Sequence, residues 1–422
     1  MGSTGEVMLA SGGGAAPAPA TSRDGRGAAA GLGPVAFKDA ADADAIPVRP
    51  PTEHDAAVSA MPARVFHNLK LRQHQGYWVL DAWARGAVAM QRGGGGLVPR
   101  ADGDVLLASL PKSGTTWLKA LAFAVMARAA HPPASPDHPL RRLNPHDCVP
   151  LVDRLFAAGR DAVLDELPSP RLMCTHMPLS LLPATVADGS SGCKIIYICR
   201  RMDPDDDVQG GDVQARQGVQ RHGTLRCSSP CSPSTAAAPA YTTARTGYSW
   251  MALRRGRSHS SPDQKDALVS MWHFLKRNGL QNLYESFCEG TCFGGPVWNH
   301  ILEYWRASKA NPSRVLFLRY ERLLQDPTDS IRELAEFVGQ PFTSSEEEAG
   351  VVTEIVELCS MENLMSQKAN KEGAQGVFIK FSHDSYFRKG VAGGWTSHMT
   401  PEMGRRLDAI LRDKFDGSGL TI

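Results

Sequence analysis

The sequence predicts an α/β fold in which helices flank a largely parallel central sheet. Three observations support this fold class. Short apolar runs that resemble buried strands recur along the chain, and segments with helical periodicity lie between or after them. One of the strand-like runs also leads directly into a glycine-containing turn and a helix. The chain has 422 residues, enough for one large domain or two ordinary ones.

The expected elements follow one another in an alternating order. Residues 71–90 carry Tyr77, Trp78 and Trp83 at roughly helical spacing and predict a first helix. Strands that are buried on both faces of a parallel sheet read as continuous apolar runs. Such runs occur at Val105–Ser109, Leu172–Thr175, Lys194–Cys199 and residues 314–320. Helical patterns cover residues 116–130, 267–276, 297–307, 330–338 and 346–358.

Two segments do not fit a packed domain. Residues 1–60 are rich in Ala, Gly, Pro and Asp and poor in large apolar side chains, which predicts a disordered N-terminal tail. Residues 201–264 show no periodicity and contain a low-complexity run, so they are interpreted as an insertion. The predicted domain therefore spans residues 65–422 and is interrupted by residues 201–264.

Composition and charge limit the function. The formal net charge of +2 gives no reason to expect a nucleic-acid or anionic-membrane partner. No apolar run approaches the ~18 residues of a membrane helix. The nine cysteines are an odd number, which favours reduced thiols and a cytoplasmic protein. The pairs Cys227/Cys231 and Cys288/Cys292 lack two further ligands nearby, so we expect no metal.

The strongest chemical signal is the segment 110–118, which follows a strand and opens a helix. Such a turn aims backbone N–H groups at one point, where the positive end of the helix dipole also attracts anions. Gly114 allows close approach of a phosphate, and Ser113, Thr115 and Thr116 add hydroxyl donors beside the charge of Lys112. A nucleotide kinase loop would place the lysine after the glycine, so this alternative is not favoured.

The sequence PKSGTTWL at residues 111–118 resembles the first signature of the soluble, plant-type sulfotransferases that use 3′-phosphoadenosine 5′-phosphosulfate (PAPS). This resemblance implies a P-loop-like PAPS-binding sulfotransferase domain. It also implies that the loop holds the 5′-phosphosulfate, that Lys112 contacts the bridging oxygen, and that Trp117 packs on the adenine.

A second stretch, residues 174–178, resembles the T-H-x-P segment of the same family. The resemblance implies that His176 is the general base. The chemistry agrees, because a hydroxyl is a poor nucleophile at neutral pH and a neutral imidazole within hydrogen-bond reach can take its proton. A single histidine among thirteen is weak by itself, and its proximity in sequence to a strand end strengthens the assignment.

A third family motif is split by the insertion. Its first half is residues 194–200, and its second half is residues 265–274. By resemblance, Arg200 and Ser270 hold the 3′-phosphate, which requires guanidinium and hydroxyl donors. Ser270 is also expected to restrain Lys112 until an acceptor arrives.

The remaining motifs complete the resemblance. Tyr320 matches the tyrosine that contacts the adenine, and the stretch that contains Cys359 and Met361 resembles the one that frames the other side of the base. Residues 387–395 resemble the family's R-K-G-x-x-G-D-W segment. By resemblance, Arg388, Lys389 and Gly390 form a clamp on the 3′-phosphate. Gly394 stands where the family has Asp, which removes an expected loop-ordering hydrogen bond.

These motifs predict a sulfotransferase that moves the sulfonate group of PAPS to a small hydroxylated acceptor, such as a flavonoid, a steroid or a hormone-like molecule. Phe274, Phe293 and Trp298 are candidates for an apolar acceptor pocket, although core packing accounts for each of them equally well. The alternative is a relative that binds PAPS or its product, 3′-phosphoadenosine 5′-phosphate (PAP), without catalysis. The oligomeric state is not predicted.

The insertion admits two interpretations. Its composition resembles translated non-coding sequence, and it would then separate Arg200 from Ser270 and destroy the 3′-phosphate site. In that case, its deletion should raise the affinity for PAPS. It is otherwise a tolerated surface loop, since the entropy of loop closure grows slowly with length.

Overall fold

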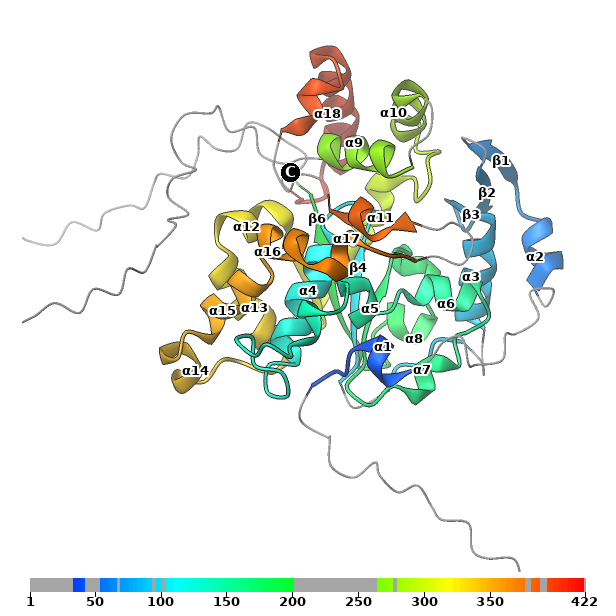
Figure 1. Ribbon diagram of the computed structural model, residues 1–422. Coiled ribbons are helices and arrows are strands. Elements are labelled where there is room, and N and C mark those ends of the chain that lie inside the picture. The colour runs from blue at the N-terminus through cyan, green and yellow to red at the C-terminus, as the bar shows by residue number, and fades with distance from the viewer. Residues whose placement is uncertain are drawn as a thin grey trace, which may run out of the picture.

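The computed structural model of the protein describes residues 33–41, 54–66, 69–92, 96–100, 103–200, 264–275, 279–375, 381–387 and 393–420. At its centre lies a four-stranded parallel sheet of order β5-β4-β6-β7 (Figure 1). The strands are β4 (Val105–Ser109), β5 (Leu172–Thr175), β6 (Lys194–Cys199) and β7 (Val315–Arg319). This sheet confirms the predicted fold class and the four predicted strands.

Both faces of the sheet are covered. Alternate residues of β6 point to opposite faces, so that Ile195 and Tyr197 join one hydrophobic cluster, while Ile196 and Ile198 join the other. The first cluster is completed by α3 (Asp81–Gln91), α6 (Val152–Ala157), α9 (Gln264–Leu275), α10 (Leu280–Cys288), α11 (Val297–Ala310) and α18 (Pro401–Phe415). The second is completed by α4 (Thr115–Met126), α12 (Tyr320–Gln325), α13 (Pro327–Val338), α15 (Val351–Leu358) and α16 (Met361–Ser366).

Shorter elements connect these layers. The short helices are α1 (Phe37–Ala40), α2 (Asp55–Ser59), α5 (Pro145–Cys148), α7 (Val163–Glu166), α8 (Ala184–Ala187), α14 (Ser344–Glu348) and α17 (Lys368–Lys371). The 3₁₀ turns are η2 (Pro139–Arg141), η3 (Leu179–Leu181), η6 (His383–Tyr386) and η7 (Gly394–Ser397). The remaining strands are β1 (Ala63–Phe66), β2 (Leu69–His74), β3 (Tyr77–Leu80), β8 (Ala374–Gln375) and β9 (Phe381–Ser382).

The prediction of one helix over residues 71–90 is wrong in its first half. Strands β2 and β3 form an antiparallel hairpin in which His74 pairs with Tyr77, and only α3 is helical. The two turn residues, Gln75 and Gly76, both have positive φ angles of 48° and 90°. This is the backbone that a two-residue hairpin requires. Tyr77 and Trp78, two of the aromatic residues that suggested a helix, therefore take a buried and a half-buried position along β3, whereas Trp83 lies on α3.

The expected helix over residues 346–358 is divided. Helix α14 ends at Glu348, and α15 begins at Val351. Gly350 precedes α15 with a φ angle of 78°, a conformation that breaks a helix and that favours glycine. A capping box between Thr343 and Glu346 also starts α14 two residues before the predicted helix.

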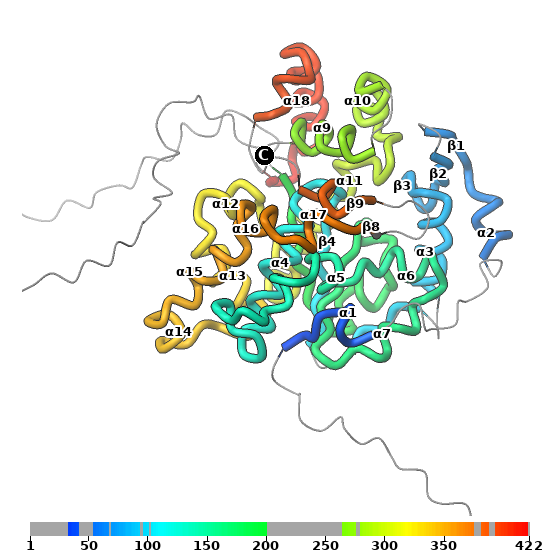
Figure 2. Tube along the Cα trace, viewed as in Figure 1, coloured from blue at the N-terminus to red at the C-terminus, as the bar shows by residue number. Residues whose placement is uncertain are grey.

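Part of the predicted N-terminal tail is folded onto the domain. Helix α1 lies beside α5, as the tube trace shows (Figure 2). Ala36, just before α1, is buried in the second cluster, and Asp39 forms an ion pair with Arg142. Val58 of α2 is buried in the first cluster. Apolar contacts together with the ion pairs of Lys38, Asp39 and Asp55 therefore place these two segments. Residues 1–32 and 42–53 lie outside the described part of the chain.

Two features of the described residues bear on other functions. No helix among them is long and apolar enough to span a membrane. Within the same residues, no group of three or more His, Cys, Asp or Glu side chains is arranged to hold a metal ion. Cys288 and Cys292 are buried free thiols, and Cys227 and Cys231 fall outside the described ranges.

Candidate active site

The predicted site lies at the carboxyl edge of the parallel sheet. Each strand runs directly into a predicted site segment: β4 into the loop 110–114, β5 into His176, β6 into Arg200, and β7 into Tyr320. The register places the strand ends at one edge, because Ala108 of β4 pairs with Thr175 of β5. Ligands of open α/β sheets bind at this edge, so the topology itself brings the four segments together.

The phosphate loop has a strained backbone of the kind that phosphate sites use. Lys112 has a φ angle of 70°, unusual for a residue other than glycine, and Gly114 has a φ angle of 113°. A Cβ atom at Gly114 would lie 2.7 Å from the ring of Tyr320. Only glycine therefore fits between the loop and the ring of Tyr320. Thr115 and Thr116 follow as the first residues of α4, whose free N–H groups form an anion-binding end.

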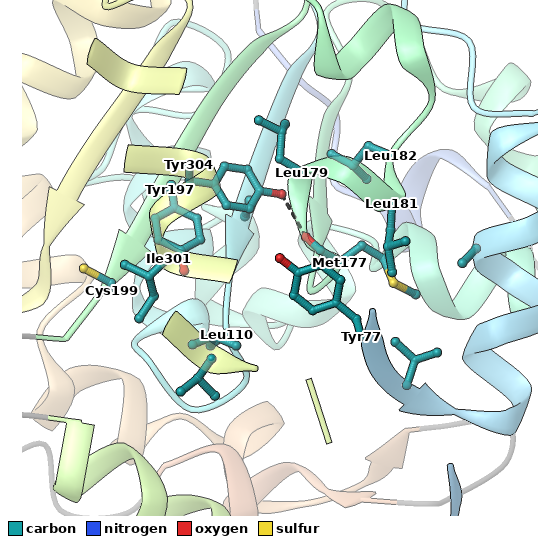
Figure 3. Close-up of a cluster of buried hydrophobic side chains, with 14 of the residues drawn as sticks. Tyr77, Leu110, Met177, Leu179, Leu181, Leu182, Tyr197, Cys199, Ile301 and Tyr304 are labelled. Carbon is teal, nitrogen blue, oxygen red and sulfur yellow. Dashed lines mark hydrogen bonds between the residues drawn. The ribbon is translucent and has the colours of Figure 1, made fainter. Parts of the chain in front are cut away.

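Hydrogen bonds hold the backbone on both sides of His176. Its backbone N–H donates to the carboxylate of Asp153 at 2.6 Å, and its carbonyl lies 3.2 Å from Nε2 of His300. The next carbonyl, that of Met177, accepts from the hydroxyl of Tyr304 at 2.8 Å (Figure 3). His300 and Tyr304 of α11 therefore hold the segment that carries His176.

The ring of His176 is held in one tautomer. Its Nδ1 lies 2.8 Å from the carbonyl oxygen of Ser109. A carbonyl can only accept, so the proton sits on Nδ1 and the lone pair on Nε2 remains available as a base. The pKa of His176 is lowered to about 4, mainly by burial and to a smaller extent by the nearby charges of Lys119 and Lys112. The imidazole is therefore neutral at pH 7.

Lys112 and Ser270 line the same cavity as His176, a space of about 190 Å³. The Lys112 ammonium donates to the carbonyl of Ser385 at 3.1 Å and lies 4.5 Å from the ring centre of Phe274. These contacts hold the charge at the cavity wall. Ser270 is buried on α9, which begins at the far end of the insertion.

Arg200, Tyr320 and Trp117 pack against one another at another wall of this cavity. The guanidinium of Arg200 lies 4.3 Å from the ring centre of Tyr320, and Trp117 meets the same ring edge-on at 5.5 Å. Nε of Arg200 is buried and has no hydrogen-bond partner among the described residues. A buried guanidinium nitrogen without a partner is costly, and an anionic ligand would satisfy it.

The two ends of the insertion meet. The side-chain amide of Gln264, the first residue of α9, donates to the carbonyl of Arg200 at 3.0 Å. Arg200 and Ser270 consequently line one cavity, although residues 201–263 separate β6 from α9 and lie outside the described ranges.

Replacement of residues 201–263 by a short linker, which keeps Gln264, is therefore expected to leave the affinity for PAP within about threefold of the intact chain. Arg200 and Ser270 already line the same cavity, and a change of loop length alone costs little. Calorimetric titration of both proteins with PAP tests this. A gain of tenfold or more on deletion would instead support the interpretation that the insertion damages the 3′-phosphate site.

Asp266 orders the C-terminal loop. Its buried carboxylate accepts from the backbone N–H of Gly393 at 2.7 Å and of Trp395 at 2.9 Å. These bonds span the position of Gly394, where the resembled family has Asp. A carboxylate from α9 thus orders this loop, which follows the predicted phosphate clamp. Arg388, Lys389 and Gly390 themselves lie outside the described residues.

The cavity gathers most of the described site residues that the sequence predicts. Those that line it are Lys112, Gly114, Thr115, Thr116, Trp117, His176, Arg200, Ser270, Tyr320 and Met361. Two others do not line it. Ser113 is buried and lines a smaller neighbouring cavity, and Cys359 is fully buried. Of the three aromatic candidates for the acceptor, Phe274 and Phe293 line the main cavity and Trp298 does not.

Sequence reasoning missed several residues around the site. Lys119 and His146 line the cavity behind Thr116, and Trp83 stacks on His176 with 6.0 Å between ring centres. Asp153 and Asp266 anchor the two segments described above. The sequence does mark Lys119, because it is the one charged residue of helix α4, which is apolar after its two N-terminal threonines. His146 and Asp153 carry no local signal of this kind.

Buried histidines should make the protein sensitive to acid. Burial lowers the pKa of His138 and His176 to about 4 and that of His300 to about 3, and it lowers the pKa of His146 well below its usual range. Below pH 6.5 the unfolded chain therefore binds more protons than the folded chain, so the free energy of unfolding decreases as the pH falls from 6.5 toward 4.

Each histidine contributes about 1.4 kcal/mol per pH unit in this window. Asp153 offsets the contribution of one histidine to this pH dependence. Burial raises its pKa to about 6, so the folded chain takes up a proton there before the unfolded chain does. Urea unfolding at pH 7 and pH 5 is expected to give a lower midpoint at pH 5. An equal or higher midpoint at pH 5 would mean that these histidines are not neutral in the fold.

Comparison with known proteins gives a consistent result. The family model for the sulfotransferase domain matches residues 102–206 and 262–419, and the unmatched gap lies within the predicted insertion. Cytosolic sulfotransferase 1 of Arabidopsis thaliana is 34% identical over 385 residues, which cover 87% of this chain and 94% of the relative.

Solved structures agree with this match. The crystal structure of an Arabidopsis thaliana sulphotransferase superposes with a TM-score of 0.60 at 30% identity, covering 89% of this chain and 99% of the other. A retinol dehydratase superposes with a TM-score of 0.56 at 16% identity, covering 88% of this chain and 96% of the other, and shows the fold alone. The chain therefore belongs to the family of PAPS-dependent sulfotransferases.

Proposed function

We propose that this protein transfers the sulfonate group of PAPS to a hydroxyl group of a small apolar acceptor, with His176 as the general base. The observation that carries this proposal is the neutral imidazole of His176, held in one tautomer, in the same cavity as Lys112 and the phosphate loop. A base and an anion-binding loop at one point are what in-line transfer between two oxygen atoms requires.

The residues of the cavity fit PAPS. The N-terminus of α4 and Lys112 suit the 5′-phosphosulfate, and the buried, unpartnered Nε of Arg200 suits the 3′-phosphate together with Ser270. Trp117 and Tyr320 provide aromatic surfaces for the adenine. Met361 is a further wall residue for the base, whereas the buried position of Cys359 favours a packing role.

The roles in the reaction follow from these positions. Nε2 of His176 takes the proton of the acceptor hydroxyl while the acceptor oxygen forms a bond to sulfur. The bond between sulfur and the bridging oxygen breaks, and its electron pair stays on the phosphate of PAP. Lys112 and the N–H groups of the loop stabilise the charge on that oxygen. The negative charge of bound PAPS also offsets the cations that lower the pKa of His176, which makes the histidine a stronger base.

The remaining walls of the cavity indicate an apolar acceptor. Trp83, Phe293, Leu69, Leu80 and Met271 line it, and Trp83 stacks on His176 and meets Phe293 edge-on. Such walls suit a hydroxylated flavonoid, steroid or hormone-like molecule. The retinol dehydratase structure contains androsterone together with PAP, an example of this acceptor chemistry on the same fold.

The aromatic pair Phe293 and Trp298 offers a matched test of the acceptor cavity. Phe293→Ala is expected to raise KM for the acceptor about tenfold, because it removes apolar contact surface from the cavity wall. Trp298→Ala removes an aromatic outside the cavity and should leave this KM unchanged. The affinity for PAP should be the same in both variants. Equal acceptor KM values would contradict the assignment of this wall.

The activity itself is tested by incubating the purified chain with PAPS and a panel of flavonoids, steroids and hydroxylated hormones, and by measuring PAP release. Acceptor-dependent release is the expected result. Binding of PAP without release from any acceptor would favour the alternative, a non-catalytic relative. Since its relatives are named cytosolic sulfotransferases, we propose the same location for this protein.

A further inference from the structure

Lys119 is a fully buried lysine behind the phosphate loop. It lies on α4, one turn after Thr115, among apolar residues of that helix. Its ammonium donates to the carbonyl of Val149 at 2.9 Å and lies 3.2 Å from Nδ1 of His146. Within the described part of the chain, no carboxylate lies within ion-pair distance of it. Burial of an ammonium group without a counter-charge carries a desolvation penalty, which hydrogen bonds or a bound anion must offset.

His146 connects Lys119 to the loop. Its Nε2 lies 3.0 Å from the hydroxyl of Thr116, which is the second residue of α4 and lines the active-site cavity. The ring is held by stacking on Tyr386, with 4.1 Å between ring centres, and the backbone N–H of His146 donates to the side chain of Asn144. Lys119, His146 and Thr116 thus form a continuous hydrogen-bonded chain that ends at the phosphate loop.

The direction of this chain follows from what each group can donate. An ammonium has donors only, so Nδ1 of His146 accepts from Lys119 and carries no proton. The proton of the neutral ring is then on Nε2, which donates to the oxygen of Thr116. The hydroxyl hydrogen of Thr116 is left for a third partner on the cavity side. If Lys119 were uncharged and accepted from Nδ1, Thr116 would donate to the histidine and would present only lone pairs to an anion.

We propose that Lys119 and His146 are positioning residues that hold the hydroxyl of Thr116 as a hydrogen-bond donor to the 5′-phosphosulfate of PAPS. The buried charge of Lys119 also favours an anion in the loop. This inference rests on the proposed function, because it assumes that the loop binds that phosphate group. It assigns a role to two residues that the cavity wall contains but that the phosphate-loop motif does not.

Two further observations support this arrangement. Burial lowers the pKa of His146 well below its usual range, and the charges of Lys119, Arg154 and Lys112 act in the same direction, so the ring stays neutral and has one proton to place. Burial also lowers the pKa of Lys119, which a bound anion would raise again. Ligand binding and the charged state of Lys119 therefore reinforce each other.

The matched variants at position 146 are Gln and Leu. Glutamine can accept from Lys119 through its oxygen and donate to Thr116 through its nitrogen, whereas leucine has a similar size and can do neither. We expect His146→Gln to keep the PAP dissociation constant within about threefold of the wild type, and His146→Leu to raise it about tenfold or more. Lys119→Met is expected to raise it by about 10- to 100-fold.

The dependence of the His146 variants on Thr116 distinguishes a positioning role from a purely structural one. In a Thr116→Val background, the hydroxyl is absent, so the Gln and Leu variants at position 146 should bind PAP equally. KM for PAPS should follow the PAP affinities, while KM for the acceptor should stay constant. Thermal unfolding without ligand shows whether each variant is folded. If Lys119→Met does not fold, the two variants of His146 still carry the test.

The outcomes are distinguishable from a failure of the proposed function. A wild-type chain that does not bind PAP would overturn the proposed function, and this inference with it. A wild-type chain that binds PAP, with folded Leu and Met variants that bind equally well, would overturn this inference alone. A further outcome is that the Gln and Leu variants differ in PAP affinity by the same factor with Thr116 intact and in the Thr116→Val background. That result would overturn the inference as well, because the effect would not pass through the hydroxyl.

Discussion

Replacement of His176 by alanine is expected to lower kcat by about 10²- to 10⁴-fold, the usual contribution of a positioned general base. The affinity for PAP should remain close to that of the wild type, because the His176 ring bonds to Ser109 and stacks on Trp83 rather than on a predicted cofactor residue. The measurement combines steady-state kinetics with calorimetric titration of PAP.

His131→Ala provides the matched control, since His131 lies beyond the opposite end of α4 and outside the cavity. It should change neither kcat nor PAP affinity. A His176→Ala variant that keeps most of its activity would require another base. The described cavity offers His146 for that role, but its two ring nitrogens already face Lys119 and Thr116.

Lys112→Met is expected to lower kcat by about 10²- to 10³-fold, since the proposed mechanism assigns to Lys112 the full charge that stabilises the leaving phosphate. The methionine keeps an unbranched apolar stem that can still pack on Phe274, so the loss should reflect charge rather than shape. The PAP dissociation constant should also rise about tenfold, as expected for one charge-assisted hydrogen bond.

Lys309→Met is a suitable control, because Lys309 makes a similar contact with the ring of Trp305 at 4.1 Å but lies outside the cavity. It should leave both constants unchanged. If Lys112→Met lowered PAP affinity without lowering kcat, Lys112 would bind the ground state only, and the role assigned to it in the transition state would be wrong.

The sequence predicts the sheet well for a physical reason. Parallel strands that are covered on both faces must be apolar throughout, so β4 to β7 stand out as short continuous runs. The phosphate loop is equally visible, because its strand, turn and helix are adjacent in sequence. Once the strands are placed, the carboxyl edge of the sheet gathers His176, Arg200 and Tyr320 without further information.

Other features depend on tertiary contacts that local sequence does not encode. Alternation and helical spacing are hard to distinguish over the few residues of 71–80, and the turn at Gln75 and Gly76 decided in favour of a hairpin. Lys119 and His146 lie on different helices, and only the packing of α5 against α4 brings their side chains together. Asp266 is visible in a motif, but its bonds to Gly393 and Trp395 join segments more than a hundred residues apart.

The measurement that tests the central claim most directly is a calorimetric titration of the intact chain, insertion included, with PAP. The account predicts saturable binding to one site per chain, weakened in the Lys112→Met and Arg200→Met variants. This result would mean that the carboxyl edge of the sheet forms the cofactor site as described. An intact, folded chain that shows no binding of PAP would contradict the account.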